Sequence, residues 1–155
     1  MSRRAETVAY VAALAVLAGL LVAEGTRRVE LERGLPVAPR EAYRTMARSP
    51  AGLQVVDVRP DLAEGYEDAH VPGAIPMPGC DPERTPAAAR ERIYPSVPTL
   101  VVSASGSEPE TARCLARFRL ARAMAGGMAA WSAANLPEDT GSYSAPSAKA
   151  GGGCL

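Results

Sequence analysis

The sequence has few residues of the kinds that build metal centres or disulfide-rich scaffolds. Among its 155 residues there are one histidine and three cysteines, and no two cysteines are close enough to form a CxxC motif. We therefore expect neither a zinc site of cysteine and histidine ligands nor a scaffold of several disulfides. Three cysteines are compatible with a reducing or an oxidising compartment, so the sequence leaves the redox compartment open.

An excess of one charge sign is also absent. The chain carries 17 basic and 17 acidic residues, and 47% of its residues are hydrophobic. Nucleic-acid binding proteins usually present a surplus of positive charge, and disordered chains are poor in apolar residues. We expect a folded protein with no nucleic-acid partner, no metal ion and no cofactor.

One long uncharged run stands near the N-terminus. It covers residues 7–23, with Arg3 and Arg4 before it and Arg27 and Arg28 after it. Its 17 residues lie at the short end of the ~17–25 that span a bilayer, and exceed the ~7–15 of a signal-peptide core. We predict a transmembrane helix over residues 7–23, with a cleaved signal peptide as the alternative.

The charges on either side of this run do not decide its orientation. Arginines stand on both flanks, and long domains cross a membrane largely regardless of charge. We expect a single-pass protein of a bacterial inner membrane and leave open which side of the membrane the globular part occupies.

Composition divides the chain into five segments. They are a short N-terminal tail (1–6), the transmembrane helix (7–23), a connector (24–35), a globular domain (36–139) and a flexible tail rich in Gly, Ser and Ala (140–155). Such a tail has too few apolar side chains to order itself.

Strand-like and helix-like segments alternate within the globular domain. Short runs rich in β-branched or small apolar residues predict strands, and apolar residues at helical spacing predict helices. We expect strands at 53–58, 74–77, 99–102 and 121–125, and helices at 38–49, 86–93, 108–118 and 128–134. The order predicts an α/β fold with a mainly parallel sheet, in which Pro76 favours an edge position for its strand.

Three stretches in this domain resemble the rhodanese-like domain family. They are DVRP…EGYEDAHVPGAIPMP from Asp57, VVSASG from Val101, and GGMAAW…LP from Gly126. The resemblance covers about two thirds of the chain and implies a central sheet flanked by helices. The positions that carry the structural motif are Asp57, Arg59, His70, Gly73, Gly126, Gly127 and Trp131. Each also has a plain structural explanation, and we favour a turn-fixing role for His70.

The loop after the strand at 99–102 departs from the family pattern. In active members this loop opens with a cysteine that carries sulfur or acts as a nucleophile; here the position holds Ser103, or Ala104 if the register shifts by one. A serine hydroxyl does not ionise near neutrality and cannot carry a transferable sulfur. We therefore predict no catalytic residue in a vestigial loop made of Ser103, Ala104, Ser105, Gly106, Ser107 and Glu108.

Two cysteines outside this loop are candidates for relocated chemistry. Cys80 follows the expected edge strand, and Cys154 ends a Gly-rich arm. Cys114 lies inside the helix after the loop and is expected to be a buried apolar side chain.

Two functions remain open from sequence. The first is a membrane-anchored, catalytically inactive rhodanese-like domain that binds an integral membrane protein or complex as an accessory subunit. The second is a sulfurtransferase or thiol carrier that uses Cys80 or Cys154. Fold alone does not choose between them.

Overall fold

A computed structural model describes residues 3–32, 35–49 and 52–145, with side chains in the first helix described from Tyr10 to Glu24. The chain divides into two compact units at Arg33 and Gly34, and each is described by itself. The predicted flexible tail lies outside the described residues from residue 146 onward.

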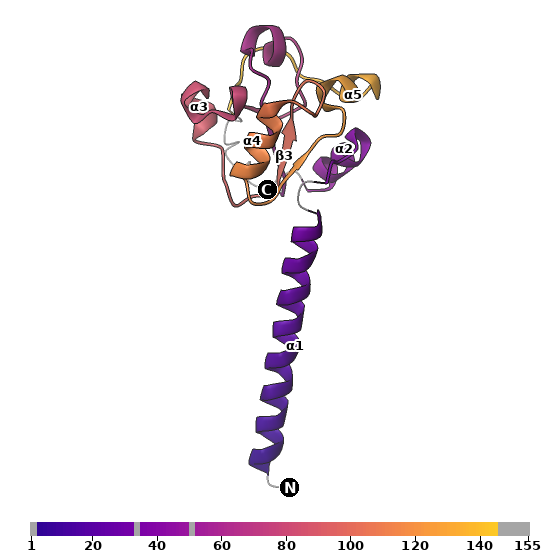
Figure 1. The fold of residues 1–155 in the computed structure, drawn as a ribbon, viewed down its shortest axis with the longest axis vertical. Coiled ribbons are helices and arrows are strands. Elements are labelled where there is room, and N and C mark those ends of the chain that lie inside the picture. Colours follow the sequence, from indigo (N-terminus) through magenta and orange to yellow (C-terminus); the bar gives the residue numbers. More distant parts are fainter. Residues whose placement is uncertain (1–2, 33–34, 50–51, 146–155) are drawn as a thin grey trace, which may run out of the picture. The chain divides into compact units, whose positions relative to one another are not determined.

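The first unit is one long helix, α1 (Arg3–Glu32) (Figure 1). It begins inside the predicted N-terminal tail and continues into the predicted connector, because no helix-breaking proline interrupts the sequence there. Among the described residues, no helix meets the length and hydropathy needed to cross a membrane. The predicted transmembrane helix is therefore not found in this part of the chain; the side chains of residues 7–9 lie outside it.

The second unit is built on a four-stranded parallel sheet. Its strands are β1 (Gln54–Asp57), β2 (Ile75–Pro76), β3 (Thr99–Val102) and β4 (Ala121–Ala123), in the order β2-β1-β3-β4. The α/β fold, the parallel sheet and the edge position of the strand with Pro76 are confirmed. Val37 extends the sheet by pairing with Met124 beyond β4.

Helices cover both faces of this sheet. They are α2 (Pro39–Arg48), α3 (Ala87–Arg90), α4 (Pro109–Arg117) and α5 (Gly127–Ala133), joined by a π-helical turn η1 (Leu62–Glu67) and 3₁₀ turns η2 (Pro78–Cys80) and η3 (Pro82–Arg84). The predicted helices are found within a few residues of their expected ends, except that the helix at 86–93 is only four residues long. The turn η1 was not predicted.

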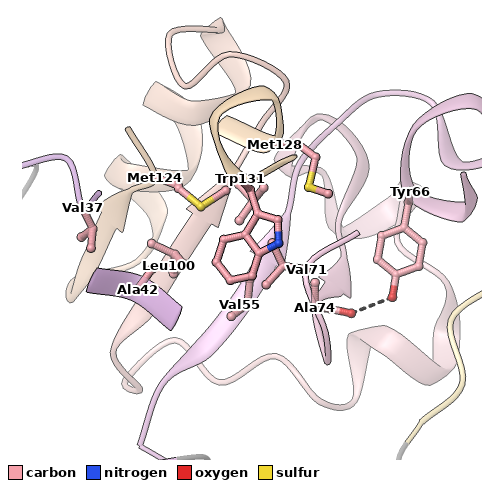
Figure 2. Packing of buried hydrophobic residues seen from close by; sticks show 11 residues of the cluster. Val37, Ala42, Val55, Tyr66, Val71, Ala74, Leu100, Met124, Met128 and Trp131 are labelled. Carbon is pink, nitrogen blue, oxygen red and sulfur yellow. Dashed lines mark hydrogen bonds between the residues drawn. The ribbon is translucent and has the colours of Figure 1, made fainter. Parts of the chain in front are cut away.

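Side chains alternate between the two faces, as expected for strands. Val55, Leu100 and Val102 belong to the face covered by α2 and α5, where Trp131 is fully buried (Figure 2). Val56 and Val101 belong to the opposite face. The buried residues on that side include Val58, Met77, Cys80, Cys114, Phe118 and Ala121. The sheet is therefore buried on both sides, which explains its nearly continuous apolar strands.

The chain stays packed beyond the predicted end of the globular domain. The backbone N–H of Gly141 donates to the carbonyl oxygen of Glu67 at 2.7 Å, and Tyr143 packs against the α5-side core. Residues 140–145, predicted as part of a flexible tail, thus contact the domain, because Tyr143 supplies an apolar ring that composition alone does not weigh.

Candidate functional site

Ser103 follows the last residue of β3, at the carboxyl end of the parallel sheet. Ligands of open α/β sheets bind at this end. The chain leaves the strand through the loop 103–108 and enters α4 at Pro109. Ser103 is only 2% exposed, so it lies at the floor of the loop.

The hydroxyl of Ser103 holds the loop together. Its Oγ accepts hydrogen bonds from the backbone N–H of Gly106 at 3.1 Å and from the Thr111 hydroxyl at 2.8 Å. Among the described residues, no hydrogen bond joins this hydroxyl to His70, the only histidine in the chain. Ser103 is therefore a structural brace without the base that a serine nucleophile needs.

Glu108 turns its carboxylate back over the loop. Oε1 accepts a hydrogen bond from the backbone N–H of Ser105 at 2.5 Å. Burial raises the pKa of this carboxyl, but hydrogen bonds from Ser103, from its own backbone N–H and from Ser105 outweigh burial and lower the pKa to about 2. The loop therefore contains a permanent negative charge near neutral pH.

Glu108 and Glu110 each have one carboxylate oxygen without a hydrogen-bond partner among the described residues. Oε2 of Glu108 and Oε2 of Glu110 are buried without a hydrogen bond within the described residues. Two carboxylates at this position oppose the entry of an anionic substrate. No group of three or more side chains in the described part of the chain is placed to hold a metal ion.

The glycine pair at the start of α5 clamps the loop. Gly127 has a φ of +56°, and a Cβ there would collide with the carbonyl oxygen of Ser103 and with Ala104. The next N–H groups, of Met128 and Ala129, donate to the carbonyl oxygens of Ser103 (2.8 Å) and Ala104 (3.1 Å). The glycine thus allows the start of α5 to bind the loop backbone directly.

The structure pairs Cys80 with Cys114 in a disulfide. Their Cα atoms lie 5.5 Å apart, and the bond joins η2 to α4 across 34 residues of sequence. Cys80 is therefore not a free sulfur acceptor here, and Cys114 is not the free buried thiol that we expected. Sequence spacing could not reveal this bond, because only the packing of α4 on η2 brings the residues together. Cys154 lies outside the described residues.

Asp57 and Arg59 form a largely buried ion pair at the end of β1. The shortest distance joins Arg59 Nη2 to Asp57 Oδ2 at 2.6 Å, and the same nitrogen donates to the carbonyl oxygen of Ala69 at 2.6 Å. The guanidinium therefore ties the end of β1 to the turn before His70. Both side chains thus have partners within the scaffold.

His70 also has scaffold partners. Its ring stacks on Tyr66 with centroids 3.9 Å apart, and its Nδ1 lies 2.7 Å from the carbonyl oxygen of Tyr66. Its backbone pairs with Asp139 through two hydrogen bonds, at 2.8 and 2.9 Å. Burial raises the pKa of Tyr66, whose hydroxyl donates to the carbonyl oxygen of Ala74 (Figure 2).

The remaining motif residues shape the fold. Gly73 takes a φ of +72° in the turn before β2. Trp131 is fully buried, and its indole Nε1–H donates to the carbonyl oxygen of Pro137 at 2.9 Å. In Figure 2 its ring lies among Val55, Leu100 and Met124.

A groove of about 1040 Å³ lies beside the edge strand and was not predicted. Its polar and aromatic lining includes Tyr66, His70, Arg92, Tyr94, Asp139 and Tyr143. Burial raises the pKa of the Tyr143 hydroxyl, against the opposing effect of Arg92. Sequence analysis missed this groove because the segment with Tyr143 was assigned to the tail.

Comparisons with known proteins agree with this architecture. The sequence model described as the rhodanese-like domain matches residues 38–134. A rhodanese-like domain from Anabaena has 25% identity and a TM-score of 0.55, covering 68% of this chain and 78% of that one. A protein of Bacillus halodurans has 21% identity and a TM-score of 0.57, covering 76% and 85%.

A third structure is a thiosulfate sulfurtransferase from Pseudomonas aeruginosa. It has 20% identity and a TM-score of 0.53, and the match covers 74% of this chain but 22% of that one. No curated protein matches the sequence. The family match over more than half of the chain shows that the chain belongs to the rhodanese-like domain family.

Proposed function

We propose that this chain is a catalytically inactive rhodanese-like domain that serves as a binding or accessory subunit of a membrane complex. The observation that carries this proposal is the loop after β3, where Ser103 replaces a thiol and is hydrogen-bonded within the scaffold. Within the described residues, both cysteines are consumed by one disulfide, so no thiolate there can accept sulfur.

A sulfur-uptake experiment tests the loss of chemistry. The full chain in detergent is incubated with thiosulfate and separately with a low-molecular-weight persulfide, and intact mass is measured with cysteine mapping. We expect no sulfur adduct on the wild-type chain or on a Cys154→Ser control. An adduct on Cys80, Cys114 or Cys154 would overturn the proposal and favour the relocated-thiol alternative.

We propose that residues 7–23 anchor the chain in a membrane. The support is the uncharged run itself and the exposure of its large side chains: Tyr10 is 73% exposed and Leu17 54%, with the others between. An apolar helix exposed on all sides needs lipid or a partner to cover it.

The chain should resist extraction from membranes by alkaline carbonate. A double variant, Leu14→Arg with Leu17→Arg, should be extracted by the same treatment. Extraction of the wild-type chain as well as the variant would contradict the anchor.

The disulfide supports an oxidising location for the globular domain. Disulfides persist outside the cytosol and are usually reduced within it. In a bacterial inner membrane the domain would then face the periplasm. The test is alkylation of whole-cell lysates of a Cys154→Ser chain with a mass-tagged maleimide. We expect no mass shift before reduction and two tags after it, whereas two tags at harvest would contradict this location.

The accessory role predicts a stable partner. The tagged full chain is purified from its native membranes in mild detergent beside a Trp131→Ala chain, which should lose the fold of the domain. We expect a membrane protein in fixed ratio with the wild-type chain and its absence from the variant. Purification of the wild-type chain alone would contradict an accessory subunit.

A further inference from the structure

The groove beside the edge strand contains a buried hydrogen-bond acceptor. His70 lines this groove and is only 6% exposed. Its Nδ1 lies 2.7 Å from the carbonyl oxygen of Tyr66, which can only accept, so the neutral ring carries its proton on Nδ1. Nε2 then has a lone pair, and no group in the described part of the chain donates to it. A buried acceptor of this kind points to a donor on a ligand.

A carboxylate stands beside this acceptor. His70 and Asp139 form an antiparallel bridge, with N–H···O distances of 2.8 and 2.9 Å in the two directions. Side chains directly opposite each other lie on one face with Cβ atoms about 4.5–5.5 Å apart, and both of these residues line the groove. The neighbouring Glu138 accepts a hydrogen bond from Ser132, whereas the Asp139 carboxylate has no hydrogen bond or ion pair within the described residues. The groove therefore presents an unpaired anion next to an unpaired acceptor.

Aromatic rings line the same groove. Tyr94, which is half exposed, and Tyr143 contribute rings to its lining. Arg92 is the one basic residue among the described lining residues, and it forms no ion pair with Asp139. A cation gains energy from the face of an aromatic ring and from a nearby carboxylate. The lining therefore matches a cationic group that donates hydrogen bonds.

The groove also has a wall of unpaired backbone. Residues 142–144 line it, and their backbone groups form no hydrogen bond within the described residues, whereas the N–H of Gly141 is bound by Glu67. Unpaired backbone donors and acceptors are a template for the backbone of another peptide. An arginine side chain suits the other wall, because its planar guanidinium has five donors and stacks on aromatic rings.

We propose that this groove binds a peptide segment of a partner protein through an arginine side chain. The guanidinium donates to Nε2 of His70 and to the Asp139 carboxylate, and the peptide backbone pairs with residues 142–144. The inference rests on the proposed accessory role for the source of the peptide. Binding is measured on this chain alone, so it can fail while a partner still purifies with the chain.

The test is an NMR titration of the ¹⁵N-labelled full chain in detergent, followed by amide chemical shifts. The probes are a blocked pentapeptide, acetyl-Thr-Val-Arg-Val-Thr amide, and the same peptide with glutamine in place of arginine. Asp139→Asn keeps the shape of the side chain and removes its charge. Asp68→Asn is the matched control, because it removes the same charge from an exposed residue that is not among the described lining residues.

We expect saturable shifts at His70, Asp139 and Tyr143 with the arginine peptide, and an affinity at least about tenfold above that of the glutamine peptide. The Asp139→Asn chain should lose most of this preference, and the Asp68→Asn chain should keep it. Equal binding of the two peptides by the wild-type chain would overturn the proposal. So would an equal loss in both variants, or the absence of shifts at these residues.

A smaller probe tests the role of the backbone without any variant. N-acetyl-arginine amide offers the same guanidinium but lacks the flanking residues that could pair with residues 142–144. We expect it to shift the same His70 and Asp139 signals with an affinity at least about fivefold below that of the pentapeptide. Equal affinities would show a site for single cations and would overturn the assignment to a peptide.

Discussion

The two faces of the sheet are stabilised in different ways. The face under α2 and α5 buries large side chains, among them Trp131, Met124 and Met128, while the face under α4 buries Phe118 beside a disulfide. The burial of these large aromatic and thioether side chains supplies the hydrophobic free energy that holds α2 and α5 on the sheet. Among the described residues the α4 face has the smaller buried cluster, and a disulfide ties α4 to η2 there.

This difference bears on the site, because each face supplies one side of the loop. The α5 face contributes the N–H groups that bind the carbonyl oxygens of Ser103 and Ala104. The α4 face contributes Thr111, which binds the Ser103 hydroxyl, and the disulfide holds the helix that carries it. The loop opens with Ser103, and contacts from both faces of the sheet support it.

The largest effect should follow from emptying the α5 face. Trp131→Ala removes a fully buried ring and the hydrogen bond to Pro137. We expect a loss of about 3–5 kcal/mol in the free energy of unfolding, enough to unfold a marginal domain. Urea denaturation followed by circular dichroism measures it. A loss below about 1 kcal/mol would mean that the two faces do not differ as described.

The α4 face is tested by removing its disulfide. A Cys80→Ala, Cys114→Ala chain should lose about 2–4 kcal/mol, because the unfolded state regains the freedom of the 34-residue loop. The control is a wild-type sample treated with reductant, which should lose a similar amount. An equal stability of all three samples would show that the disulfide adds nothing to this face.

The junction between loop and α5 is tested at two glycines. Gly127→Ala brings a methyl group into the Ser103 carbonyl, whereas Gly73→Ala, also at positive φ, meets open space. We expect a cost of roughly 1–3 kcal/mol at Gly127 from overpacking, in addition to the roughly 1 kcal/mol of backbone strain at either site. Equal losses would contradict a tight clamp at Gly127.

The smallest effect concerns the charge of Glu108. Its pKa is 4.5 in the unfolded chain and about 2 in the folded one, so the folded state binds its proton less readily. The stability that this lowered pKa contributes is therefore complete above about pH 5 and is lost as the pH falls toward 2. The wild-type chain should lose more stability over this range than the Glu108→Gln chain. Parallel pH profiles would contradict the contact.

Much of the fold could be predicted because local patterns and tertiary contacts agree. The strand over 99–102 was predicted at its observed ends, since a threonine and three apolar residues, rich in β-branched side chains, stand directly before a small-residue loop. The helix at 86–93 is shorter than expected, because after Glu91 the N–H groups of Arg92 and Ile93 bind carbonyl oxygens three residues back and not four, so the α-helical pattern ends. The π-helical turn η1 was not predicted, although the Asp61 side chain caps its start by accepting a hydrogen bond from the Glu64 N–H, and that spacing is present in the sequence.

Some features of the candidate site could likewise be predicted from the sequence, and others could not. The serine at position 103, where the family resemblance leads one to expect a cysteine, could be read directly from the sequence. The disulfide was not visible, because its two cysteines are 34 residues apart and no spacing rule joins them. The contact of Glu108 could be predicted only in part. The sequence gives the charge of the side chain, but not the direction in which it points.

The sequence by itself determined the order of strands and helices, the family resemblance and the absence of a cysteine after β3. These features depend on residue identity and short-range periodicity, which the linear chain contains in full. Tertiary structure alone decided the partner of Cys80, the packing of Tyr143 and the Glu108–Ser105 contact. Disulfide formation and packing depend on distances across the fold, and the last contact depends on a side-chain rotamer, so no local pattern contains them.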